Sequence, residues 1–223
     1  MKRVVGLGAG GHAKVLIDIL HQSGEYDVIG LLDPDKAGQV LGGVLVLGND
    51  ERLAQIREDG VTCAFIGVGG VGDNSLRTTL YQKALAAGFT VVNAIHPTAI
   101  LAPSVQLGQG VAIMAGAIVN ADAIISDNVI INTGAIVEHD CAIGAHVHIS
   151  PGAILSGGVR VGESAHIGAG ATVRQCITIG AEAIIGAGAV VIRDTPPNTV
   201  SIGVPARVIK FKKKDPWRPF NGS

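Results

Sequence analysis

The chain has 223 residues, of which 48% are hydrophobic, and a formal net charge of −1 at pH 7. This length allows one large domain or two small ones with a real core. The near-neutral charge argues against nucleic acid as a partner, because phosphate binding usually shows as a basic excess. Glycine is abundant, at 32 residues, and aromatic residues make up only 3%, which favours thin, tightly wound coils over a bundle or sandwich core.

The cysteines and the N-terminal segment indicate where the protein works. Cys63, Cys141 and Cys176 form no Cys-x-x-Cys pair and are odd in number, as expected for the reduced thiols of a cytoplasmic protein. Basic residues precede apolar ones at the N-terminus, but the glycines from Gly8 onward interrupt any signal-peptide core. No apolar run is long enough to cross a bilayer, so we expect no membrane association.

The first part of the chain, residues 1–94, alternates short apolar runs with helix-like stretches in which apolar residues recur at spacings of three and four. The expected strands cover 3–7, 28–32, 62–66 and 90–93, and the expected helices cover 12–21, 50–58 and 75–87. Such alternation predicts a small α/β domain with a parallel, Rossmann-like sheet.

From Ile95 to Val191, every sixth residue is Ile, Leu or Val, at 17 successive positions. A small or β-branched residue sits four positions after each, and glycine often follows the aliphatic residue directly. This is the hexapeptide repeat of a parallel β-helix, in which six residues form one strand and one corner. We expect the aliphatic side chains to stack inside and glycine to be needed for the corner dihedrals. The prediction is a β-helix over 95–207, about five coils and roughly 25 Å tall, followed by a tail over 208–223.

Three motifs, taken in order and spacing, resemble the NeuD/PglD-type family of bacterial sugar acyltransferases. They are Gly8-Ala9-Gly10-Gly11-His12-Ala13-Lys14-Val15, then Asn132-Thr133-Gly134-Ala135-Ile136-Val137-Glu138-His139-Asp140-Cys141, then His148-Ile149-Ser150-Pro151-Gly152. The resemblance implies a mainly β protein, a left-handed parallel β-helix preceded by a small α/β Rossmann-like domain. It also implies a homotrimer that binds acetyl-CoA between neighbouring β-helices and acetylates the C4 amine of a nucleotide-linked 4-amino-4,6-dideoxyhexose. Such products, for example perosamine, bacillosamine or viosamine derivatives, enter surface glycans.

The strongest catalytic candidate is His139, which lies between Glu138 and Asp140. Histidine suits proton transfer near neutral pH, and an adjacent carboxylate fixes its tautomer and raises its basicity. The resemblance places the general base on His139, the tuning carboxylate on Asp140, and Asn132 near the acceptor amine. It implies acetyl-CoA contacts at His148, Gly157, Ala169 and Ala187. It implies nucleotide-sugar contacts at Gly10, Gly11, His12, Asp33 and Gly67.

Several alternatives remain open at this stage. The closest is O-acetylation of a sialic acid by the same family. A zinc-dependent hexapeptide carbonic anhydrase could draw ligands from His139, His146, His148 and His166, although their spacing does not fit and we expect no metal. A non-catalytic scaffold and a dinucleotide site at the Gly-rich turn are more remote, because the α/β domain is too short for two mononucleotide-binding halves. The nucleotide carrier, UDP, GDP or dTDP, is open, and Lys212–Lys214 could approach the phosphates of CoA.

Overall fold

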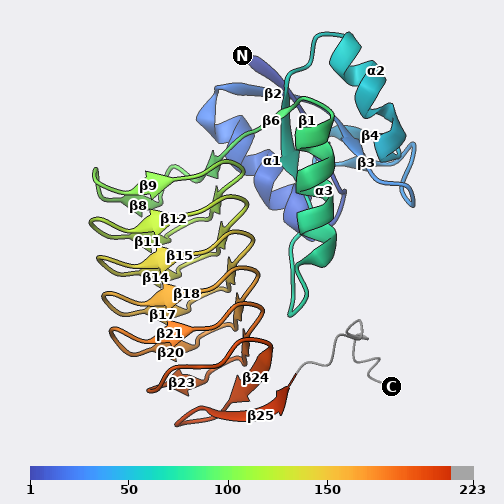
Figure 1. The fold of residues 1–223 in the computed structure, drawn as a ribbon. Helices are drawn as coiled ribbons and strands as arrows, with labels where there is room; N and C mark the ends of the chain where they lie inside the picture. Colours follow the sequence, from blue (N-terminus) through green and yellow to red (C-terminus); the bar gives the residue numbers. More distant parts are fainter. Residues whose placement is uncertain (212–223) are drawn as a thin grey trace.

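A computed structural model describes residues 1–211, which form an α/β part packed against a long β-helix (Figure 1). The predicted fold class is confirmed. None of the helices within these residues is both long enough and apolar enough to span a membrane.

The α/β part is built on one six-stranded sheet with the order β3-β4-β2-β1-β5-β6. Its parallel strands are β1 (Lys2–Leu7), β2 (Tyr26–Leu32), β4 (Val44–Gly48), β5 (Cys63–Ile66) and β6 (Thr90–Val91). Its helices are α1 (Gly11–Ser23), α2 (Leu53–Glu58), which follows the 3-10 turn η1 (Asp50–Arg52), and α3 (Ser75–Ala86). All expected strands and helices are present, with ends shifted by a few residues.

The sequence prediction missed a β-hairpin in this part. β3 (Val40–Leu41) pairs antiparallel with β4, joined by Gly42 and Gly43, which both have positive φ. A two-residue Gly-Gly connection between apolar residues is a recognised hairpin signal. The Gly42-Gly43 signal was present in the sequence, but the prediction considered only an alternation of strands and helices.

The β-helix stacks its two-residue strands into three sheets, named here face 1, face 2 and face 3. Face 1 contains β7 (Ala94–Ile95), β10 (Ala112–Ile113), β13 (Ile130–Ile131), β16 (His148–Ile149), β19 (His166–Ile167), β22 (Ile184–Ile185) and β24 (Thr199–Ile202). Face 2 contains β8 (Ile100–Leu101), β11 (Ile118–Val119), β14 (Ile136–Val137), β17 (Ile154–Leu155), β20 (Thr172–Val173) and β23 (Val190–Val191). Face 3 contains β9 (Gln106–Leu107), β12 (Ile124–Ile125), β15 (Ala142–Ile143), β18 (Arg160–Val161) and β21 (Thr178–Ile179).

From β7 to β23, strand pairing follows the six-residue phase without a slip, so residues 18 apart are stacked neighbours; for example, His148 pairs with His166. The predicted aliphatic positions form one continuous core together with the small residues near the corners. The outer surface of face 1 is covered by the α/β part, where Ala112 and Ile130 share a cluster with Leu16 and Ile17 of α1. The first strand of the β-helix, β7, includes Ala94, so the expected boundary between 94 and 95 falls within a strand.

The reason we expected for the repeated glycines was wrong. The glycines that directly follow an aliphatic residue, such as Gly144 and Gly168, do not have positive φ. A Cβ at Gly144 would lie 2.7 Å from the backbone nitrogen of Glu163, and a Cβ at Gly168 would lie 2.6 Å from that of Ala187. Close approach of the next coil therefore demands these glycines. The positive dihedrals occur two residues later in the corner, where Asp140 adopts one without being glycine.

The C-terminal end extends the pairing beyond the regular coils. After the turn at 194–198, β24 pairs with β22 and is joined antiparallel by β25 (Arg207–Phe211). The first residues of the expected tail therefore belong to a strand whose residues are all exposed. Lys212–Lys214 lie outside the described residues.

A buried arginine on α3 connects the α/β part to the β-helix through hydrogen bonds. The Arg77 guanidinium donates hydrogen bonds to four carbonyl oxygens at 2.8–3.3 Å, those of Ile66, Val68, Gly110 and Asn128. The first two belong to the α/β part and the last two to β-helix corners. Burial lowers the pKa of Arg77 to about 9, so the side chain remains a cation at neutral pH and is held by carbonyl dipoles.

Candidate active site

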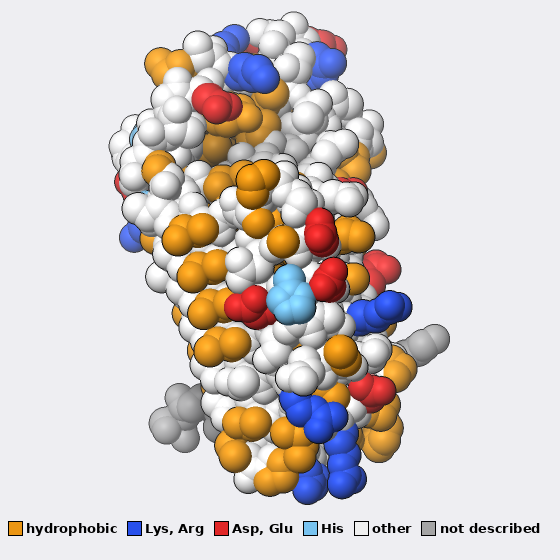
Figure 2. Space-filling view, turned by 90° about the vertical axis from the view of Figure 1, so that its left-hand side faces the viewer, with side chains coloured by type: hydrophobic (Ala, Val, Ile, Leu, Met, Phe, Trp, Pro, Cys, Tyr) orange, Lys and Arg blue, Asp and Glu red, His pale blue; other side chains and the backbone are white. Residues whose placement is uncertain are grey.

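His139 and Asp140 lie in the corner between face 2 and face 3, directly after β14. The two side chains are exposed by 62% and 66%, and His139 Nδ1 lies 2.7 Å from Asp140 Oδ2. The hydrogen bond that His139 donates to Asp140 raises the pKa of His139, and the charges of Asp140 and Glu138 act in the same direction. With its Nδ1–H donated to the carboxylate, the imidazole presents its Nε2 lone pair as a base. Figure 2 shows acidic side chains gathered around an exposed histidine on this side of the β-helix.

Gly157 lies directly beneath the imidazole, one coil further along the chain. A Cβ at this position would lie 2.6 Å from His139 Nε2 and 2.7 Å from Cε1. The ring can therefore rest over the backbone only because residue 157 has no side chain. Within residues 1–211, the Gly157 N–H donates to no other group, while the neighbouring Gly158 N–H donates to the His139 carbonyl. The His139 imidazole and a free backbone donor thus lie side by side.

Glu138 has a partner that sequence reasoning missed. Asn120, one coil earlier, donates from Nδ2 to Glu138 Oε2 over 2.9 Å. This hydrogen bond holds the Glu138 carboxylate, and Asp140 is the carboxylate that hydrogen-bonds to the imidazole. The 18-residue separation of Asn120 and Glu138 was visible in the sequence and marks them as stacked corner residues.

Asn132, Ala169 and Ala187 lie in a different corner, the one between face 1 and face 2. Ala169 and Ala187 are exposed and stacked in consecutive coils, since Gly188 N–H donates to the Ala169 carbonyl. Asn132 Nδ2 lies 3.1 Å from His148 Nε2, and its Oδ1 accepts from the Thr133 backbone N–H.

His148 is buried and connects this corner to the α/β part. Its Nδ1 hydrogen-bonds the carbonyl oxygen of Gly70, and its Nε2 faces Asn132. Burial lowers its pKa to about 4, so the ring is neutral, donates from Nδ1 and accepts at Nε2. Its predicted contact with acetyl-CoA stays a prediction, because both ring nitrogens already have partners within the chain.

The predicted nucleotide-sugar residues cluster at the start of α1. Gly10 and Gly11 do not have positive φ, and a Cβ on either would meet no atom within 4 Å. The chain itself therefore has no need of glycine at these positions, and the open space suits close approach of a ligand. The α1 N-terminus has no side-chain cap and no acidic residue in its first turn, as an anion site requires.

Two further residues, Asp33 and Lys36, hydrogen-bond to the Gly-rich turn. Asp33 accepts from the Ala9 N–H at 2.9 Å and the Asp35 N–H at 3.1 Å, so its carboxylate holds the Gly-rich turn in place. Lys36, which the sequence prediction missed, donates to the Ala9 carbonyl at 2.7 Å and brings a cation to the same turn.

His12 and Gly67 lie on the inner side of the turn. Burial lowers the pKa of His12 to about 3, with the charge of Arg77 acting in the same direction, and within the described residues its Nε2 is buried without a hydrogen-bond partner. A Cβ at Gly67 would clash with the Gly8 carbonyl oxygen and lie 2.9 Å from Ala13 Cβ. Gly67 therefore has a packing reason to be glycine, whatever its role in binding.

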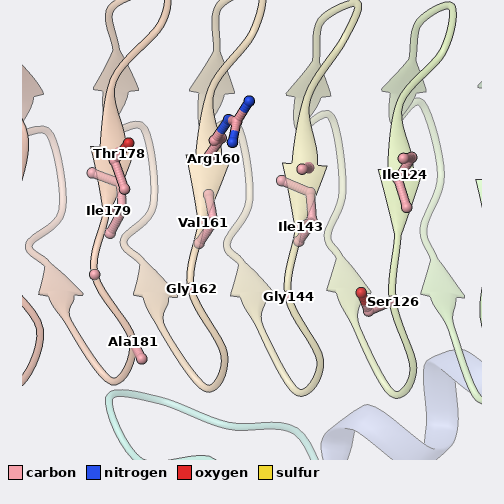
Figure 3. A pocket seen from close by; sticks show the side chains of 12 residues that line it. Ile124, Ser126, Ile143, Gly144, Arg160, Val161, Gly162, Thr178, Ile179 and Ala181 are labelled. Carbon is pink, nitrogen blue, oxygen red and sulfur yellow. The ribbon is translucent and has the colours of Figure 1, made fainter.

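A shallow hollow of about 400 Å³ lies over face 3, away from these groups (Figure 3). Its lining includes Ile124, Gly144, Arg160, Gly162, Thr178 and Gly180. The column of glycines leaves this edge of the coils without side chains, which accounts for the hollow. None of the predicted site residues is among those that line it. In the part of the chain that the structure describes, no group of three or more His, Cys, Asp or Glu side chains could hold a metal ion.

Comparisons with known proteins agree with this architecture. Residues 3–84 match the PglD N-terminal domain, and residues 158–193 match the bacterial transferase hexapeptide family. PerB from Caulobacter crescentus, solved with CoA and GDP-perosamine, is 50% identical over 94% of this chain and 98% of PerB, with a TM-score of 0.88. The acetyltransferase domain of PglB from Neisseria gonorrhoeae is 39% identical over 94% of this chain and all of that domain, with a TM-score of 0.88. The chain belongs to the PglD-type family of hexapeptide acyltransferases.

Matches among curated proteins are more local. UDP-N-acetylbacillosamine N-acetyltransferase from Bacillus subtilis is 41% identical over 116 residues, which are 52% of either chain. An uncharacterized protein of Acanthamoeba polyphaga mimivirus is matched over 22% of its length at 32% identity. The chain thus spans about half the length, or less, of the curated relatives it matches.

In this PglD-type chain, the predicted site residues form three separate groups. His139, Asp140 and Gly157 share one corner, and Asn132 and the two alanines share another, at the opposite ends of the face 2 strands. The nucleotide-sugar residues lie on the α/β part, which packs on face 1. Asn132 and His148 link the last two groups, but the corner that carries His139 stands apart from both.

The contact between His139 and Gly157 gives a direct test of the site. We expect Gly157→Ala to displace the imidazole and to lower kcat about 100-fold, because a misplacement of about 1 Å has that effect on positioned groups. Ser156→Ala is the matched control, since it changes the neighbouring side chain of the same corner and leaves the backbone as it is. Steady-state kinetics with thermal melting measures both, and Gly157→Ala with unchanged turnover would contradict the arrangement.

Proposed function

We propose that the protein transfers the acetyl group of acetyl-CoA to the C4 amine of a nucleotide-linked 4-amino-4,6-dideoxyhexose, for a bacterial surface glycan. The observation that carries the proposal is the His139 ring, held by Asp140 and resting over the free N–H of Gly157. Relatives that align over nearly their full length support the substrates, since PerB was solved with CoA and GDP-perosamine and the PglB domain with acetyl-CoA. PerB favours GDP as the carrier, and the Bacillus enzyme favours UDP.

The chemistry follows from the atoms in the corner. The neutral amine attacks the thioester carbonyl carbon, and the negative charge that forms on the oxygen is stabilised by the Gly157 N–H. His139 Nε2 accepts the proton that the attacking nitrogen loses. The C–S bond then breaks, and the imidazolium returns the proton to the departing CoA sulfur. Asp140 stabilises the imidazolium between these two steps.

We further propose that the working unit is a homotrimer in the cytoplasm, with the acetyl-CoA groove between neighbouring subunits. If face 2 of each chain faces a threefold axis, the corner carrying His139 lies against the neighbour's corner carrying Asn132, Ala169 and Ala187. This arrangement would bring the two corners together across the subunit interface, although they lie apart within one chain. The outer positions of face 2 support it, because five of its six strands carry aliphatic side chains there: Ile100, Ile118, Ile136, Ile154 and Val190. Figure 2 shows a column of hydrophobic side chains running along the β-helix beside the histidine.

The reaction is tested by following thiol release from acetyl-CoA with a panel of UDP-, GDP- and dTDP-4-amino-4,6-dideoxyhexoses and with sialic acid. We expect turnover with one of the amino sugars and a loss of about 100- to 10,000-fold in His139→Ala, the usual contribution of a general base. Turnover with sialic acid alone would replace the proposal with O-acetylation. A fully active His139→Ala enzyme would refute the role of this histidine.

The pH dependence of kcat/KM tests the pair formed by His139 and Asp140. The base works unprotonated, so activity is lost as the pH falls through the raised pKa of His139. Asp140→Asn removes the charge that raises this pKa, while asparagine tolerates the positive φ of the position. We expect the acid limb to move to lower pH and the plateau rate to fall at least tenfold. The matched control is Asp122→Asn, at the same corner position one coil earlier and without an adjacent histidine. It should change neither the acid limb nor the plateau rate.

The trimer is tested by placing a charge on the outer surface of face 2. Ile136→Lys would put an ammonium group into the apolar contact around the axis, which is strongly unfavourable without a partner. We expect dissociation to monomers at micromolar concentration, measured by light scattering after size exclusion, together with loss of turnover. Ile124→Lys, on the outside of face 3, is the matched control and should remain trimeric. A trimeric Ile136→Lys protein would show that face 2 does not face the axis.

A further inference from the structure

Glu138 lies next to His139, on the side toward the outer surface of face 2. In β14, Val137 points into the core and Ile136 points outward, so the alternation of a strand places the Glu138 side chain on the outside. Figure 2 shows acidic side chains on both sides of the exposed histidine. The hydrogen bond to Asp140 raises the pKa of His139, and the charges of Asp140 and Glu138 raise it further. Glu138 therefore lies close enough for its charge to act on the imidazole.

Only one oxygen of the Glu138 carboxylate is used within the described residues. Asn120 Nδ2 donates to Oε2 over 2.9 Å, and the pair is partly buried. Among the interactions of residues 1–211, Oε1 accepts no hydrogen bond and Glu138 forms no ion pair. The Asn120 nitrogen can donate but cannot accept. It therefore fixes the carboxylate with one oxygen turned toward it and leaves the other oxygen for a further donor.

The attacking amine needs two hydrogen-bond acceptors. A neutral primary amine has two N–H groups and one lone pair, arranged tetrahedrally about the nitrogen. The lone pair points at the thioester carbonyl carbon only when both hydrogens are held elsewhere, and such orientation is a large part of the rate of a positioned reaction. In the proposed mechanism His139 Nε2 accepts one of these hydrogens. A second acceptor is needed beside it.

Two other candidates for this second acceptor are engaged or face away. Asp140 hydrogen-bonds to Nδ1 over 2.7 Å, so it lies on the opposite side of the imidazole from Nε2. Asn132 Oδ1 accepts from the Thr133 backbone N–H at 2.8 Å and from the Thr133 hydroxyl at 3.3 Å, and its Nδ2 faces His148. Both lone pairs of that oxygen are thus in use. Oε1 of Glu138 is free and belongs to the residue next to the base.

We propose that Glu138 Oε1 accepts the second N–H of the acceptor amine, and that Glu138 thereby selects an amine over a hydroxyl. This inference rests on the proposed function, because it takes the C4 amine as the acceptor. A hydroxyl at the same position has a single hydrogen, which His139 takes, so the carboxylate would face an oxygen lone pair and lose its partner. A site built to hydrogen-bond a substrate group discriminates strongly against an analogue that lacks it. Asn120 is the positioning residue, since it turns Oε1 toward the substrate.

The test uses the full-length wild type, Glu138→Gln and Asn120→Ala. It measures kcat/KM for the amino sugar that is acetylated and the inhibition constant Ki of the same nucleotide sugar with a C4 hydroxyl. In Glu138→Gln the amide oxygen faces the Asn120 donor, so the NH2 group puts a donor where the free acceptor was. We expect kcat/KM to fall about 30-fold, as for one charge-assisted hydrogen bond, while the Ki stays roughly the same. Asn120→Ala should lower kcat/KM about fivefold, because the carboxylate keeps its charge and loses only its orientation.

The pH profile separates a hydrogen bond to the substrate from an effect of charge on the base. Loss of the Glu138 charge lowers the pKa of His139 and moves the acid limb of kcat/KM to lower pH, whereas loss of the hydrogen bond lowers the plateau. Glu163→Gln is the matched control, because it removes the same charge from an exposed residue in the corner between face 3 and face 1. It should change neither the acid limb, the plateau nor the Ki.

The outcomes separate this inference from the proposed function. A lower plateau for the amine with an unchanged Ki supports the inference. An acid limb that moves while the plateau stays overturns it, because Glu138 would then act on the histidine through its charge alone. A Ki that rises as much as kcat/KM falls also overturns it, because Glu138 would then bind another part of the sugar. In these cases the wild type still acetylates an amine, and the proposed function stands. A wild type that acetylates no amine overturns the proposed function and this inference with it.

Discussion

The stacking of one coil on the next is the constraint on which the rest of the molecule depends. Backbone hydrogen bonds join each coil to the next, as between the Gly158 N–H and the His139 carbonyl and between the Cys176 N–H and the Gly157 carbonyl. Since the phase does not slip between β7 and β23, a residue's position modulo 18 decides which corner it occupies there. A one-residue insertion between 139 and 157 would move the backbone N–H of Gly157 away from the His139 imidazole, which the stacking now places beside it.

The attachment of the α/β part follows a different principle, because it depends on buried polar groups and not on a repeat. Arg77 holds carbonyl groups of both parts, and Asn74 beside it donates to the His146 carbonyl at 2.9 Å. His148 adds a third link through Gly70. A buried cation without an acidic partner is stable only when its hydrogen bonds are all made, so this attachment fixes the relative position of the two parts closely. That position would set where the proposed nucleotide sugar at α1 lies relative to Asn132.

Features of the fold and the site that follow from the six-residue repeat could be predicted from the sequence, whereas contacts between segments that share no repeat could not. The inward aliphatic positions, the three faces and the stacking of residues 18 apart follow from the period alone, and that period also puts Gly157 one coil beyond His139. The hairpin at Gly42 and Gly43 was predictable and was missed. The four carbonyls around Arg77 and the link from His148 to Gly70 were not predictable, because they join segments with no common period. The glycines after the aliphatic residues were placed correctly for the wrong reason, since only the structure shows how closely the next coil approaches.

The exposure of His139 bears on why a single chain would be a poor catalyst. In water, a hydrogen bond or a charge contributes little to the stabilisation of a transition state, because solvent screens it. His139 and Asp140 are both more than half exposed, so their interaction is weak until something excludes water from the corner. In the proposed trimer, the neighbour's corner of small residues does this and still leaves room for the pantetheine arm. Assembly of the trimer would then exclude water and lower the local dielectric constant. The electrostatic interactions of the histidine, its carboxylate and the Gly157 N–H with the transition state would become stronger as a result.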